Sequence, residues 1–108
     1  MTLLSFPRCC VSAEQLRRLF NELELFAKVQ RGELQQQIRK DKHPAPPKAD
    51  EPFCTRSQIV AYYDSDGNKV ALVHQYLRPD GTLGASGLPD PKMVLHGNVI
   101  YYTRGENT

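Results

Sequence analysis

The stretch SQIVAYYDSDGNKVALVHQYL, residues 57–77, decides the fold. Residues 58–63 are rich in β-branched and aromatic side chains, which are typical of a strand. Residues 64–68 have the composition of a tight turn, and residues 69–77 predict a second, longer strand. Two strands joined by so short a turn run antiparallel, so this stretch predicts a β-hairpin.

The residues that follow this hairpin continue the pattern of short strands and turns. Residues 78–82, RPDGT, predict another turn, because proline is preset for the first corner and glycine closes it. The later elements are expected to be a short strand near Leu83, a loop over 84–91, and strands over 92–95 and 99–103 that flank the hairpin signal His96-Gly97-Asn98. Residues 57–103 therefore predict an antiparallel meander of about four strands.

Residues 12–40 predict helical structure. Ser12 is a suitable N-cap, and Gln15 completes a capping box with it. Apolar residues then recur every three or four positions and form one stripe, made of Leu16, Leu19, Phe20, Leu23, Phe26 and Ala27. The stripe weakens near Gly32, where a glycine costs a helix about 1 kcal/mol relative to alanine. Either one helix runs from residue 13 to about 40, or two helices join near Gly32.

The prediction for the whole chain is one α+β domain of 108 residues. Its helical segment, 12–40, and its sheet, 57–103, are joined by residues 41–56, a proline-rich stretch expected to be a stiff spacer. The alternative for this stretch is a PxxP ligand for an SH3-type domain. Residues 1–11 and 104–108 are expected to be tails.

The helical segment also suggests a partner. A continuous helix over these residues would be about 42 Å long at 1.5 Å per residue, which exceeds the width of a domain of this size. It would project from the sheet with its apolar stripe uncovered. The sequence therefore predicts a homodimer that pairs through this helix.

Charge and composition narrow the functional classes. The net charge is +2, and residues 54–108 carry five acidic and five basic side chains, so the sheet lacks the basic excess typical of a nucleic-acid binder. Nucleic acid is therefore not expected as a partner, and the protein or small-molecule partner is left open. No apolar run is long enough to cross a membrane, so no membrane partner is expected.

Cysteine usage and the N-terminus point to a reducing compartment. Cys9, Cys10 and Cys54 are an odd number without disulfide or zinc-site spacing, so neither a metal nor another cofactor is expected. The first residues lack the basic start and long apolar stretch of a secretory signal. The expected location is the cytoplasm.

The most distinctive chemical feature is a polar face on the second strand. His74, Tyr76 and Arg78 are spaced by two and therefore share one side of that strand. They could supply a general acid or base and a clamp for phosphate or carboxylate. The alternative is a half-buried strand in which His74 bonds a neighbour and Tyr76 covers the core.

The loop over 84–91 is the second candidate. Two prolines bracket Asp90 and stiffen the backbone, and two glycines allow tight curvature or close approach of a ligand. Ser86 and Asp90 are therefore candidate ligand-binding residues, although such a loop can simply turn a corner.

Two functions follow from these observations. The preferred one is a non-enzymatic binding protein, because no catalytic motif is present. In element order alone, helices followed by an antiparallel meander, the chain resembles RelE-type mRNA-cleaving toxins. That resemblance implies a ribonuclease acting from the sheet face, with His74, Tyr76, Arg78 and Lys92 as candidate catalytic residues.

Overall fold

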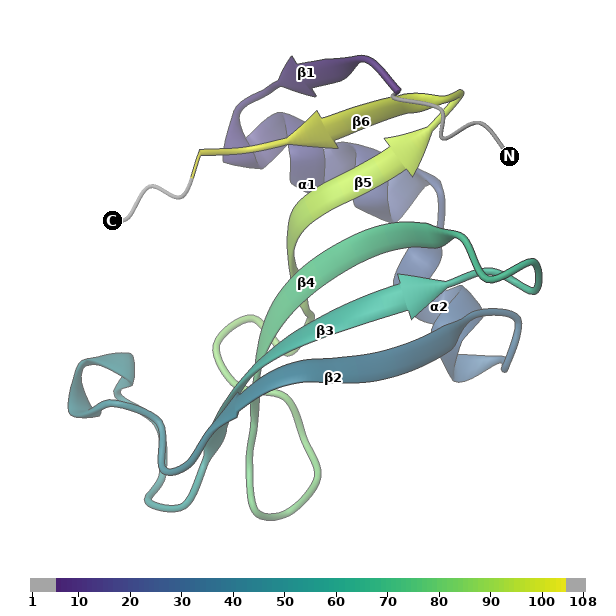
Figure 1. Ribbon diagram of the computed structural model, residues 1–108. Coiled ribbons are helices and arrows are strands. Elements are labelled where there is room, and N and C mark those ends of the chain that lie inside the picture. The colour runs from purple at the N-terminus through teal and green to yellow at the C-terminus, as the bar shows by residue number, and fades with distance from the viewer. Residues whose placement is uncertain (1–5, 105–108) are drawn as a thin grey trace.

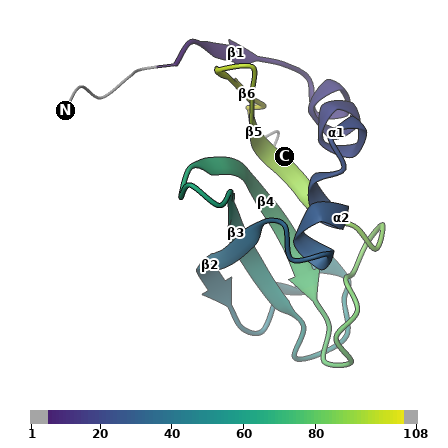
Figure 2. The same cartoon turned by 90° about the vertical axis from the view of Figure 1, so that its right-hand side faces the viewer.

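Six strands form one sheet, and two short helices lie against one of its faces, in the computed structural model, which describes residues 6–104 (Figures 1 and 2). In chain order the elements are β1 (Arg8–Cys10), α1 (Ala13–Glu22), α2 (Leu25–Gln30), β2 (Gln35–Lys42), the 3₁₀ turn η1 (Pro47–Ala49), β3 (Arg56–Tyr63), β4 (Lys69–Leu77), β5 (Asp90–His96) and β6 (Val99–Tyr102).

The predicted fold class, an antiparallel meander of about four strands behind an N-terminal helix, is wrong. The sheet is mixed, its strand order is β1-β6-β5-β4-β3-β2, and β1 runs parallel to β6. Strands β3 to β6 occupy the region of strong alternation, and β1 and β2 add one strand at each side. β1 lies in the expected N-terminal tail, and β2 spans the end of the expected helical segment and the first two residues of the expected spacer.

Strand β2 replaces the second half of the expected helix. Gly32, with a φ of +81°, occupies the left-handed region that favours glycine and lies in the turn that follows α2. The eight residues of β2 are all exposed, so as a helix they would have had almost nothing to bury. As a strand they pair with β3 from Gln35 opposite Tyr63 to Lys42 opposite Ser57. Backbone pairing with β3 therefore outweighs the weak helical preference.

Helix α1 begins as predicted and ends early. The Ser12 Oγ accepts a hydrogen bond from the Gln15 amide at 3.0 Å, and the Gln15 side chain accepts one from the Ser12 amide at 3.0 Å. Glu24, with a φ of 55°, is left-handed and separates α1 from α2. No helix in residues 6–104 is long and apolar enough to cross a membrane.

The apolar stripe of the helices is covered by the chain's own sheet. Leu16 and Phe20 of α1 are 0% and 2% exposed. They belong to one core cluster with Leu25 and the strand residues Val60, Tyr62, Ala71, Val73 and Val94. The expected homodimer required a long helix with an uncovered stripe, whereas the helices are short and their stripe is covered by the sheet.

Phe20 tests this core. Its ring centroid lies 6.1 Å from that of Tyr62 beneath the helix, whereas Phe53 is 83% exposed. We expect Phe20→Ala to lower the free energy of unfolding by about 3–5 kcal/mol, because the substitution leaves a cavity. Phe53→Ala is the matched control and should change it little. Equal effects in urea titrations would contradict this view of the core.

Tyr62 provides a second test. Its hydroxyl is fully buried and has no hydrogen-bond partner among the described residues, and burial raises the pKa of the phenol. An unsatisfied buried hydroxyl is destabilising, so Tyr62→Phe should raise the free energy of unfolding by about 1 kcal/mol. The neighbouring Tyr63 hydroxyl accepts a hydrogen bond from Arg39 at 3.0 Å, so Tyr63→Phe should bring no such gain. A destabilised Tyr62→Phe variant in thermal unfolding would show that the hydroxyl has a favourable role.

Candidate functional site

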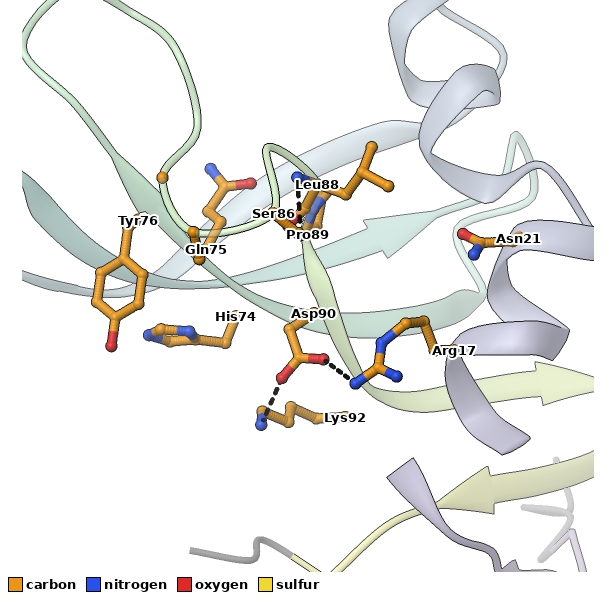
Figure 3. Close-up of a pocket in the computed structure, with 12 residues that line it drawn as sticks. Arg17, Asn21, His74, Gln75, Tyr76, Ser86, Leu88, Pro89, Asp90 and Lys92 are labelled. Carbon is orange, nitrogen blue, oxygen red and sulfur yellow. Dashed lines mark hydrogen bonds and ion pairs between the residues drawn. The ribbon is translucent and has the colours of Figure 1, made fainter. Parts of the chain in front are cut away.

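An open cleft of about 640 Å³ lies where β5 begins (Figure 3). It is bounded by α1, by the C-terminal half of β4 and by the loop that precedes β5. Its lining residues are Arg17, Asn21, His74, Gln75, Tyr76, Gly84, Ala85, Ser86, Leu88, Pro89, Asp90 and Lys92. The volume is within the range of small-molecule sites. Five of the six residues singled out from the sequence line this cleft, and the sixth, Arg78, does not.

The charged side chains of the cleft gather around Asp90. The Lys92 Nζ lies 3.1 Å from one carboxylate oxygen of Asp90, and Arg17 Nη2 of α1 lies 3.9 Å from the other (Figure 3). Among the described residues that line the cleft, Asp90 is the one carboxylate and faces these two cations. The three side chains are partly exposed, so each ion pair contributes little to stability. Together they leave an excess of one positive charge.

His74 lies in the cleft as a neutral, partly buried imidazole. Its Nε2 is 2.8 Å from the Ser57 hydroxyl, and its ring meets that of Tyr76 edge-on at a centroid distance of 4.7 Å. Burial is the main cause that lowers the pKa of His74 below its usual 6.5, and the charge of Lys92 adds to this effect while Asp90 opposes it. Burial therefore favours the uncharged form of His74, which forms hydrogen bonds rather than ion pairs.

Arg78 supports the loop from outside the cleft. Its Nε donates to the Glu51 carboxylate at 2.8 Å, and the other oxygen of Glu51 accepts from the Ala85 amide at 2.9 Å. The Glu51 side chain is only 6% exposed. A Cβ added at Gly84 would fall on the Glu51 carboxylate, so a larger residue here would displace the end of the Glu51 side chain. The contact formed by Glu51, Arg78, Gly84 and Ala85, here called the loop clasp, fixes one wall of the cleft.

The loop itself is a tight, locally bonded turn. Gly87 N donates to Gly84 O at 3.0 Å, and the Ser86 hydroxyl accepts from the Leu88 amide at 3.3 Å. Ala85 has a φ of 54°, which is uncommon for a residue with a Cβ. The Ser86 hydroxyl therefore shapes the loop, while the Asp90 carboxylate faces the cations.

Three contributors to the cleft were missed in the sequence. Arg17 and Asn21 lie on the polar side of α1 and reach the cleft only because α1 packs against β5. Glu51 lies in the proline-rich stretch that was expected to be a simple spacer. Arg78 indicates that an acidic partner lies nearby, but the sequence does not indicate that Glu51 is that partner.

Neither a metal site nor a known relative accounts for the cleft. The described part of the chain has no group of three His, Cys, Asp or Glu side chains placed to hold a metal ion. No family model, no curated protein and no solved structure matches the chain. The geometry of the cleft is therefore the basis on which a function can be inferred.

The loop clasp can be tested by hydrogen exchange. Glu51→Gln removes the charge of the carboxylate, so exchange of the Ala85 amide should accelerate by roughly tenfold. Asp50→Asn, the adjacent control, should leave it unchanged. Both hydrogen bonds lower the pKa of Glu51, so the clasp is intact above the ordinary value of 4.5 and is lost only as the pH falls through the lowered pKa of this carboxyl. Unchanged exchange in Glu51→Gln would show that the loop does not depend on this contact.

Proposed function

We propose that this chain is a non-enzymatic binding protein whose cleft at the start of β5 takes a small molecule with an anionic group. The observation that carries the proposal is the sharing of Asp90 by Lys92 and Arg17 inside a concave, partly apolar cleft. Ligand sites commonly combine apolar walls with a few placed polar groups.

Electrostatics favours an anion over a cation. Arg17 and Lys92 each face one oxygen of the same carboxylate, and they are 53% and 38% exposed. An incoming carboxylate or phosphate can bond both cations, and because these side chains are partly exposed, binding removes little of their hydration and the desolvation cost stays low. A cation would have to compete with both side chains for Asp90.

The remaining lining supports a small organic ligand. Leu88, Pro89 and the ring of Tyr76 offer apolar contact. Gln75 is held by a 2.9 Å hydrogen bond from its Nε2 to the buried Gln58 side chain, so this wall is rigid. A rigid wall reduces the ordering cost of binding.

The ribonuclease alternative has partial support. His74, Tyr76 and Lys92 share the cleft, and neutral His74 could accept a proton. Arg78, the fourth candidate, is paired with Glu51 outside the cleft and is not free to contact a phosphate there. We therefore favour binding without catalysis.

The expected homodimer and the expected cytoplasmic location have different support. The homodimer is not part of this proposal, because the helix that was to pair two copies is covered by its own sheet. A cytoplasmic location is kept, because all three cysteines are free and two of them are exposed, which suits a reducing compartment.

Arg17 and its neighbour Arg18 provide a matched test. Arg18 pairs with Glu14 on the same helix and does not line the cleft. In NMR titrations with inorganic phosphate at constant ionic strength, the backbone amides of residues 85–88, 90 and 92 should shift and saturate. Arg17→Gln removes one charge-assisted contact, about 1.5 kcal/mol, so affinity should fall by roughly tenfold. Arg18→Gln should leave it nearly unchanged.

Two results would contradict the proposal. One is the absence of saturable shifts around the cleft with phosphate or acetate. The other is an equal loss of affinity in both arginine variants, which would indicate a diffuse charge effect. Cleavage of added RNA that disappears in His74→Ala would favour the ribonuclease instead.

A further inference from the structure

The face of the sheet opposite the helices has no helix over it among the described residues (Figure 2), and apolar side chains form a row on it. Ala71 and Val94 belong to the core beneath the helices. Side chains alternate along a strand, so the neighbouring Leu72 and Met93 point to the other face. Leu72 pairs with Met93, and Met93 pairs with Tyr102, so the three form one row across β4, β5 and β6.

A groove of about 490 Å³ follows this row. Its floor is formed by Leu72, Met93, Ile100 and Tyr102. Three cations, Arg8, Lys69 and Lys92, surround this floor, and no carboxylate belongs to the described residues that line it. The Arg8 guanidinium lies 4.9 Å from the centroid of the Tyr102 ring. The groove therefore combines an apolar floor with a positive rim.

Lys92 connects this groove to the cleft. It lines both of them. Leu72 pairs with Met93 and Val73 pairs with Pro91, so Lys92 is the extra residue of a β-bulge between these two pairs. The anion-binding end of the cleft and the apolar groove therefore meet at one lysine.

We infer that the ligand of this protein is an amphipathic anion, a free alkyl carboxylate whose head binds Lys92 and Arg17 beside Asp90 and whose chain lies in the groove over Leu72 and Met93. The inference rests on the proposed function, because it assigns the ligand class of the same cleft. The positive charges around the groove favour an acid, and the apolar floor of the groove favours an alkyl chain. The groove is concave and its volume suits a small molecule, so a single alkyl chain fits it better than the flat surface of a partner protein does.

A chain-length series tests this ligand class. Acetate, butanoate, hexanoate and octanoate are titrated by NMR at constant ionic strength and below micelle-forming concentrations. Affinity should rise by roughly three- to fourfold for each buried methylene. Met93→Gln keeps the side-chain length but makes the floor polar, so it should flatten this dependence and leave acetate binding intact. Ile38→Gln, on the exposed strand β2, is the control and should leave the whole series unchanged.

The outcomes separate this inference from the proposed function. If acetate and phosphate bind at Lys92 and Arg17 with no gain from chain length, the inference fails and the proposed function stands. If no anion binds there, both fail. A chain-length gain that survives Met93→Gln would place the chain elsewhere and overturn the inference. So would an octanoate-induced doubling of mass in light scattering, or capture by phosphatidylglycerol vesicles without saturable binding of free octanoate.

Discussion

Two short helices can cover only one face of a six-stranded sheet, and the rest of the structure depends on this constraint. Leu16 and Phe20 reach the sheet from α1 and bury Val60, Tyr62 and their neighbours completely. Burial of such side chains supplies most of the free energy of folding in a chain of this size. The opposite face keeps partly exposed apolar side chains, Leu72 and Met93 among them.

The docking of α1 on β5 also creates the cleft. Packing of the apolar stripe fixes the polar side of the helix as well, and that side carries Arg17 to Asp90 at the first residue of β5. Beyond His74 and Asp90, β4 has no partner on β5, so the loop that precedes β5 fills the space next to β4. No additional helix or strand is needed to form a cleft where β4 and β5 separate. The cleft needs a loop of fixed shape, which the loop clasp provides.

Charge organises the cleft without stabilising the fold to a large extent. Asp90 and its two cations are partly exposed, whereas Glu51 is almost fully enclosed between Arg78 and the loop backbone. The enclosed pair of Glu51 and Arg78 fixes the geometry of the loop, whereas the exposed ion pairs of Asp90 can exchange partners. This division of roles explains why Arg78, which the sequence places beside His74 and Tyr76, belongs to the scaffold.

The sequence by itself determined the local features of this protein. Alternation over residues 57–77 determined the central hairpin, and Ser12 with Gln15 determined the start of α1, because both depend on contacts between near neighbours. The positions of His74, Tyr76, Asp90 and Lys92 on or beside strands were also predictable, since these strands are recognisable in the sequence. Only the tertiary structure decided that residues 35–42 form a strand, that Arg8–Cys10 pair with β6, and that Arg17 and Glu51 join the site. Each of these depends on a partner distant in sequence, and local preference is too weak to specify such a partner when backbone pairing or burial elsewhere gains more free energy.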